Sequence, residues 1–262
     1  MTDLQWKIFC EFKTAYKNII DEWALRVPDL QSLQKRVAAE CGTPAYSFET
    51  PIVYNRALDD IKPADDIKLI VIGDNPGKEE QLFCNNRYLV GQAGRIAEGY
   101  FKRNPGLGVD FRRNVIILNK TPIHSAKTAQ LKMMAKCGGA GLASLLEESQ
   151  IWCAKETAKL HISLCEAGKK VGAVCPELWL VGYSELKEKG IFAKYRNELR
   201  SAYENASFCE GWNSVYVFQH FSMNRFTIDL SDYMKKNDCE ERSLQECIHS
   251  LGEIHKKEIF NY

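Results

Sequence analysis

The stretch KLIVIGDNPGKEEQ, residues 68–81, changes character halfway along its length. An apolar run over 68–72 is followed at once by Asp, Asn, Pro and Gly at 74–77. A short apolar run that is bounded by turn-forming residues predicts a buried strand. In open α/β sheets, ligands bind just beyond the carboxyl ends of the strands. The turn at 74–77 is therefore the first place to look for chemistry.

Three further apolar runs predict buried strands, at 115–118 (VIIL), 178–181 (LWLV) and 215–218 (VYVF). Helical patterns alternate with the four strands, at 92–102, 140–168, 184–206 and 229–258. Strands that are apolar throughout and alternate with helices indicate a parallel sheet covered on both faces. The fold class is therefore α/β, a three-layer α/β/α arrangement around a central, mainly parallel four-stranded sheet.

The first 64 residues have a different pattern. Apolar residues at helical spacing predict an amphipathic helix over 3–27, and a second helix follows at 30–41. Three prolines punctuate 42–67, which is interpreted as a connector that wraps the domain. We therefore divide the chain into an N-terminal helical extension with its wrapping segment (1–64) and an α/β domain (65–262).

Composition limits the classes of function. Of 262 residues, 45% are hydrophobic and 26% are charged, which is enough for one substantial core. The net charge of +1 provides no global basic field for nucleic acid, so any basic site is local. There is no secretion signal pattern and no apolar run of the ~18 residues that a membrane span needs. We expect a soluble, cytoplasmic monomer without a membrane partner.

The ten cysteines are scattered, with no C-x-x-C pair. Structural zinc and iron–sulfur sites favour close pairs. We therefore expect reduced thiols that behave as small hydrophobic side chains, no metal and no cofactor.

Side chains suited to chemistry follow three of the four predicted strands. They are Asp74 and Asn75, then Asn119 and Lys120, then His220. Each also has a purely structural interpretation: Asn75 as a helix cap, Asn119 as a turn former and His220 as a buried core histidine. Lys120 opens a modestly basic stretch, which is either a solvated loop or an edge that contacts phosphate. A phosphate-binding loop is excluded, because the two glycines at 73 and 77 are too close together.

Four segments together resemble the uracil-DNA glycosylase superfamily. GDNPG (73–77) resembles its first motif, which is G-E-A-P-G in the iron–sulfur branch and G-[IM]-N-P-G in the mismatch-specific and single-strand-selective branches. YLVGQAGRI (88–96) resembles P-F-V-G-x-A-G, ILN (117–119) resembles the strand end that presents a base-reading asparagine, and QHFS (219–222) resembles the closing H-P-S motif. The resemblance covers about 66–230, in the family's order.

The sequence also departs from the family pattern. Leu89, with Tyr88 beside it, stands where the family has the aromatic residue that stacks on the extruded base. Phe221 replaces the proline of the closing motif, and the cluster cysteines of the iron–sulfur branch are absent. Together with the resemblance, these departures imply a divergent branch of the superfamily.

The resemblance implies a DNA-base N-glycosidase that removes uracil or a related damaged base, the first step of base-excision repair. His220 would donate to uracil O2, Asp74 would face the sugar cation, and Asn75 would hold the water. Asn119 would read the base, because its amide can donate to O4 and accept from N3–H. Gly73, Tyr88 and Leu89 complete the predicted base-binding set.

The partner that the resemblance implies is DNA. Met223 or Arg225, in the loop after the closing motif, would fill the gap that an extruded base leaves. The other predicted DNA contacts are Gly77, Gly91, Gly94, Lys120 and Ser222. The alternative is a catalytically inactive protein that keeps the fold and binds a base, a nucleotide or nucleic acid.

Overall fold

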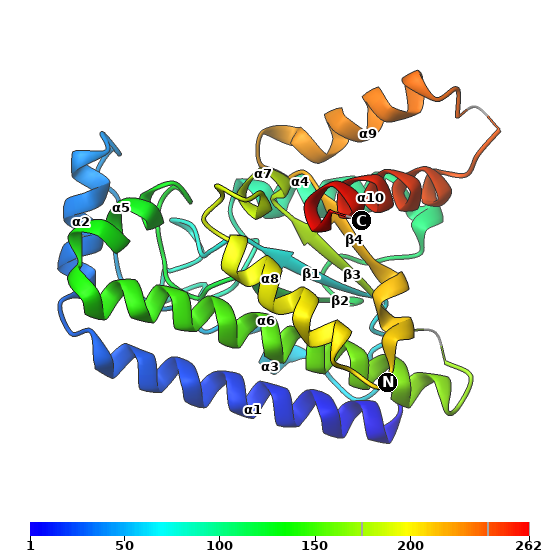
Figure 1. Ribbon diagram of the computed structural model, residues 1–262, viewed down its shortest axis with the longest axis horizontal. Helices are drawn as coiled ribbons and strands as arrows, with labels where there is room; N and C mark the ends of the chain where they lie inside the picture. The colour runs from blue at the N-terminus through cyan, green and yellow to red at the C-terminus, as the bar shows by residue number, and fades with distance from the viewer. Residues whose placement is uncertain (174, 240, 262) are drawn as a thin grey trace.

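A computed structural model describes residues 1–173, 175–239 and 241–261 (Figure 1). Its centre is one sheet of four parallel strands in the order β2-β1-β3-β4. The strands are β1 (Leu69–Gly73), β2 (Val115–Asn119), β3 (Glu177–Val181) and β4 (Val215–Phe218). All four predicted runs therefore share one sheet, with bounds within one residue of those predicted. The predicted fold class is confirmed.

Helices cover both faces of this sheet. One face is covered by α6 (Gly139–Lys169) and α8 (Ala193–Glu204), and the other by α4 (Gln92–Arg103) and α10 (Leu244–Phe260), with α9 (Arg225–Lys236) beyond α10 (Figure 1). Burial of almost every strand residue follows from this cover, and it explains why the strands are apolar throughout rather than alternating.

Shorter elements complete the chain. They are α2 (Leu30–Glu40), α3 (Ala57–Asp60), α5 (Gln130–Cys137), α7 (Tyr183–Leu186) and the 3₁₀ turns η1 (Pro105–Leu107), η2 (Cys209–Ser214) and η3 (Ser222–Asn224).

Two predicted helices are each split in two. The pattern at 184–206 is divided between α7 and α8, because the chain turns at Gly190, whose missing side chain lets it pack against the Glu185 carbonyl. The pattern at 229–258 is divided between α9 and α10. Ser243 starts α10 with a capping box, since its hydroxyl accepts from the Glu246 amide and the Glu246 side chain accepts from the Ser243 amide. That S-x-x-E signal marks a second helix start, and periodicity alone overlooks it.

The N-terminal helix α1 (Asp3–Arg26) runs along α6 (Figure 1). Phe9 and Trp23 of α1 are fully buried in the same hydrophobic core as the sheet. The connector that follows is tied to the chain beyond β2, because Ile52 forms a β-bridge with Ile123. Within the described residues, none of the helices has both the length and the apolar character that crossing a membrane requires.

Candidate functional site

The residue after β1 and the residue after β2 form a buried ion pair. Lys120 Nζ lies 2.6 Å from Asp74 Oδ1 and also donates to the Val181 carbonyl at 2.5 Å. Lys120 has no solvent-exposed surface, and this burial lowers its pKa against the opposing effect of Asp74. The predicted DNA contact through Lys120 is therefore wrong. Its ammonium points into the protein, where it satisfies acceptors at the ends of β1 and β3.

Asp74 and His220 line the same cavity, which has a volume of about 520 Å³. Asp74 follows β1, and His220 lies two residues after β4. Gly182 lies directly after β3 with φ of +99°, and a Cβ built on it would lie 2.3 Å from Asp74 Oδ1. Glycine at 182 therefore makes room for the carboxylate. We call this space the strand-end cavity.

The hydrogen bonds of His220 determine which ring nitrogen carries the proton. Its Nδ1 accepts from the Ser222 amide at 3.1 Å and lies 2.8 Å from the Ser222 hydroxyl. In the neutral ring the proton is therefore on Nε2. Burial lowers the pKa of His220 below 6.5, Asp74 opposes this shift, and the charge of Lys120 adds to it. His220 is thus a neutral imidazole with one N–H to donate near pH 7.

Asn119 is buried at the end of β2 and is not among the residues that line the strand-end cavity. Its Oδ1 packs against Gly73, the residue paired with it in the sheet, where a Cβ would lie 2.4 Å away. Its Nδ2 is buried and has no hydrogen-bond partner in the described part of the chain. An unpaired buried amide costs free energy, about 1–3 kcal/mol. The prediction that Asn119 opens onto the same cavity as Asp74 is not met.

Asn75 has a structural role. Its Nδ2 donates to Ser125 Oγ at 2.9 Å, and its Oδ1 accepts from Thr128 Oγ1 at 3.0 Å. These bonds fasten the loop after β1 to the loop after β2, and Asn75 is not among the residues that line the strand-end cavity, so the predicted role of holding water there is not met. Nor does Asn75 cap a helix, since residues 74–91 form turns and α4 begins only at Gln92.

Tyr88 and Leu89 belong to the core. The Tyr88 hydroxyl is within 2.5 Å of the Val53 carbonyl and 2.7 Å of the Tyr16 hydroxyl. Leu89 is 3% exposed, and Gly94 packs so tightly against its carbonyl that a Cβ there would lie 1.5 Å from the oxygen. Neither side chain lines the strand-end cavity. The predicted roles of Tyr88 and Leu89 in base binding, and of Gly94 in DNA binding, are therefore corrected to roles in packing.

The remaining predicted DNA contacts divide into two groups. Met223, Arg225 and Ser222 line the strand-end cavity, and Met223 is 70% exposed. Gly91, in contrast, is the half-buried N-cap of α4, and the Gly77 amide already donates to Glu80 Oε2. The side chains in the loop after β4 are thus placed to meet a ligand in the cavity.

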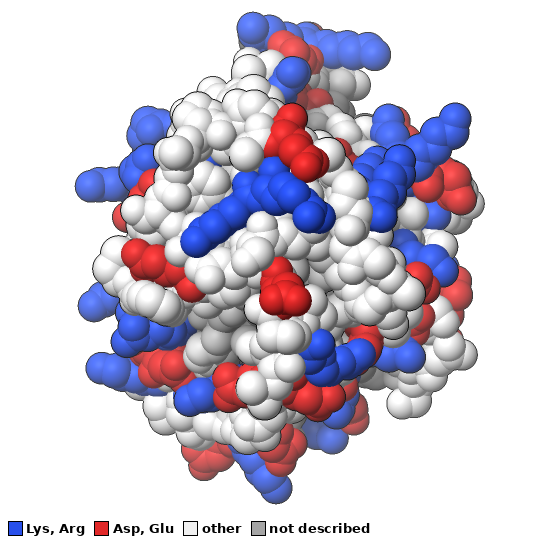
Figure 2. Space-filling view, turned by 90° about the vertical axis from the view of Figure 1, so that its left-hand side faces the viewer, with Lys and Arg blue, Asp and Glu red and all other residues white. Residues whose placement is uncertain are grey.

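Acidic residues that sequence reasoning missed also line the cavity. Glu185, Asp229 and Asp232 join Asp74, whereas Arg225 is the one Lys or Arg among the described lining residues. Burial raises the pKa of Asp229, and the nearby His255 opposes this shift. Glu185 lies four residues after β3, where it could have been noticed, but α9 supplies Asp229 and Asp232 without any local signal. Figure 2 shows basic and acidic side chains interspersed over the face at the α2 and α5 end, where neither sign dominates.

The cysteine prediction is wrong for one pair. Cys165 and Cys175 form a disulfide. Among the cysteines whose side chains the structure describes, seven others are free: Cys10, Cys41, Cys84, Cys137, Cys153, Cys239 and Cys247. The two cysteines are ten residues apart, and no sequence motif predicts a disulfide at that spacing. Only the tertiary structure shows the pairing.

The chain matches no known family model, no curated protein and no solved structure. Any assignment of function therefore depends on the arrangement of the strand-end cavity and on the sequence motifs that surround it.

Proposed function

We propose that this chain is an N-glycosidase that releases uracil or a related damaged base from DNA. The observation that carries the proposal is that Asp74 and His220 line one cavity, at the carboxyl ends of β1 and β4. Ligands of open parallel sheets bind at this edge. An acid and a neutral imidazole are the two groups that this reaction requires.

Cleavage of the N-glycosidic bond places positive charge on the sugar and negative charge on the departing base. The Asp74 carboxylate stabilises the cationic sugar, and Lys120 holds the carboxylate in place through Oδ1. Asp74 Oδ2 is then available to orient the attacking water. His220 donates its Nε2 proton toward the base oxygen, where charge develops. A neutral donor suits this step, because it stabilises an anion without first having to be protonated.

Selectivity for the base would come from Asn119. Its Nδ2 has no partner among the described residues, and a uracil O4 would satisfy it. Cytosine presents a donor at the same position and would leave the amide unpaired. Because Asn119 is 2% exposed, the side chains that cover it must move before a base reaches it.

The acidic lining supports a second candidate function, a non-catalytic protein that binds a free base or nucleoside. Four carboxylates in the cavity repel phosphate, whereas one arginine attracts it. An uncharged ligand would meet no such repulsion.

Strand cleavage by alkali, measured on uracil-containing oligonucleotides at low salt, tests the proposal. We expect base release by the unaltered protein and a loss of about 10²- to 10⁴-fold in Asp74→Asn and in His220→Ala. Asp66→Asn and His249→Ala are the matched controls, because both residues lie outside the strand-end cavity. Absence of cleavage together with calorimetric binding of free uracil would favour the non-catalytic alternative.

A further inference from the structure

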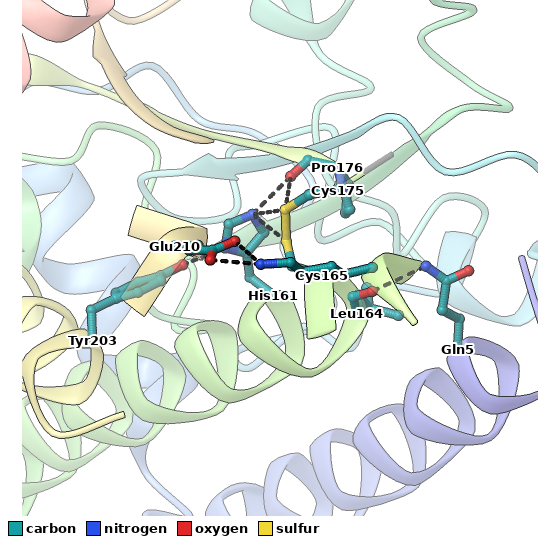
Figure 3. Close-up of a disulfide and its surroundings, with 9 residues drawn as sticks. Gln5, His161, Leu164, Cys165, Cys175, Pro176, Tyr203 and Glu210 are labelled. Carbon is teal, nitrogen blue, oxygen red and sulfur yellow. Dashed lines mark hydrogen bonds and ion pairs between the residues drawn. A yellow bond between two sulfur atoms is a disulfide. The ribbon is translucent and has the colours of Figure 1, made fainter. Parts of the chain in front are cut away.

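A second cluster of chemically capable side chains lies away from the strand-end cavity, at the amino-terminal edge of β3 (Figure 3). His161 and Cys165 are one turn apart on α6, so they project from the same face of the helix. Cys175 reaches them from the segment just before β3. His161 and Cys165 are buried, and Cys175 is half-buried. Together the three residues present one imidazole nitrogen and two sulfur atoms.

The distances between the nitrogen and the sulfurs suit a tetrahedral metal ion. His161 Nε2 lies 3.6 Å from Cys165 Sγ and 3.8 Å from Cys175 Sγ. Zinc bonds of about 2.3 Å to sulfur and 2.0–2.1 Å to nitrogen separate neighbouring ligands of a tetrahedron by roughly 3.5 Å. The imidazole is therefore already at ligand distance from both sulfurs. Metal binding requires that the bond between the two sulfurs be broken and that Nε2 lose its proton.

The second ring nitrogen of His161, Nδ1, has a hydrogen-bond partner of the kind that metal-bound histidines have. The Tyr203 hydroxyl lies 2.6 Å from Nδ1, and Tyr203 is itself buried. In the disulfide form, Tyr203 donates to Nδ1 while Nε2–H donates to the Pro176 carbonyl at 2.8 Å. Moving the proton to Nδ1 would let Nδ1–H donate to Tyr203 and would free Nε2 for a metal. Such outer contacts orient histidine ligands in metal sites.

A cavity of about 450 Å³, lined by Cys165 and Cys175, provides access to the cluster. We propose that, when the disulfide is reduced, Cys165, Cys175 and His161 bind one zinc ion and leave its fourth position open to this cavity. The disulfide and the zinc site are alternatives, because the sulfurs cannot hold both bonds.

A phosphine reductant and zinc together convert the disulfide form into the zinc form. A phosphine reductant attacks the disulfide and becomes a phosphine oxide with the oxygen of one water molecule. The protons of that water and two electrons go to the sulfurs and yield two thiols. Zinc then displaces both thiol protons, while the imidazole proton moves from Nε2 to Nδ1.

The test uses the full chain, reduced with a phosphine and freed of metal by dialysis. We expect it to take up about one zinc ion per chain. With cobalt(II) as the probe, we expect the visible bands of a tetrahedral ion and a thiolate-to-cobalt charge-transfer band. Cys175→Ser should lose the charge-transfer band or most of its intensity. Cys153→Ser is the matched control, because Cys153 is a buried cysteine on the same helix outside the cluster, and it should retain the full spectrum.

Tyr203→Phe adds a graded measurement, since it removes only the hydroxyl that contacts Nδ1. We expect zinc affinity to fall about 10- to 100-fold, measured by competition with a chromophoric chelator. The result with the unaltered chain decides the matter even if a variant fails to fold. Reduced protein that takes up neither zinc nor cobalt would show that the cluster is a disulfide only, and iron in place of zinc would also overturn the proposal.

Discussion

Replacing Lys120 with methionine tests whether the ion pair with Asp74 organises the strand-end cavity. Methionine keeps most of the length and apolar volume of the lysine stem but removes the ammonium. The ammonium contacts Asp74 Oδ1 at 2.6 Å, the Val181 carbonyl at 2.5 Å and the Gly73 carbonyl at 3.3 Å. Lys120→Met therefore leaves a carboxylate and two carbonyls without this donor, in a place that is almost closed to solvent.

The magnitude follows from burial. Lys120 is completely buried, and Asp74 is 8% exposed. Removing one partner of a buried ion pair costs about 3–5 kcal/mol of unfolding free energy, because the remaining charge is uncompensated. In a chain of this size, each kcal/mol lowers the melting temperature by about 2–4 °C. Lys120→Met should therefore melt about 6–20 °C below the unaltered protein, and the base release that we propose should fall with it.

The assay is thermal unfolding followed by circular dichroism, supported by urea unfolding at pH 7. Lys68→Met is the matched control, because Lys68 pairs with Asp66 at 3.7 Å on the surface and its loss should cost less than about 1 kcal/mol. Asp74→Asn should recover part of the stability when combined with Lys120→Met, with a coupling of about 1–3 kcal/mol. A loss below about 1 kcal/mol in Lys120→Met, or strict additivity in the double variant, would refute the reasoning.

Three further predictions concern stability. Burial lowers the pKa of His124 from 6.5 to about 4, so the unfolded chain takes up a proton at a higher pH than the folded chain does. Between pH 6.5 and 4, protonation of His124 should therefore lower the unfolding free energy by about 3 kcal/mol. In His124→Gln, the unfolding free energy measured in urea should fall less over the same pH range. Burial raises the pKa of Glu80 from 4.5 to about 7, so the contribution of Glu80 to stability is full below pH 4.5 and is lost as the pH rises through 7. Between pH 4 and 8, the stability of Glu80→Gln should therefore increase relative to that of the unaltered protein. Parallel profiles of unfolding free energy against pH would contradict this. Gly182→Ala should cost about 1–3 kcal/mol because of its positive φ and the contact with Asp74, whereas Gly106→Ala, with open space around it, should change the melting temperature little.

Local sequence patterns determined the secondary structure and the class of fold. The four apolar runs became the four strands because a strand covered on both faces needs apolar residues at every position. The same reasoning placed α1, α2, α4 and α6 within about two residues of their bounds. Errors arose where a local start or stop signal was overlooked, as at Ser243, whose capping box begins α10.

Sequence reasoning also placed Asp74 and His220 at the same end of the sheet, where both line the strand-end cavity. Asp74 and His220 lie about 145 residues apart in the chain, yet both follow strands of one parallel sheet, and the carboxyl ends of such strands meet. This inference needs only the direction of the strands and the fact that they share a sheet, which the alternation of strands and helices provides.

Which way each side chain points was decided by the tertiary structure alone. Lys120 could have faced solvent, but the register that pairs Gly73 with Asn119 brings it between the ends of β1 and β3. There, three oxygen atoms accept hydrogen bonds from its ammonium group. Burial and partners of this kind depend on contacts between residues far apart in the chain, and no local pattern encodes them. The sequence does not predict the convergence of His161, Cys165 and Cys175 for the same reason. No sequence motif indicates that Cys175 lies next to α6.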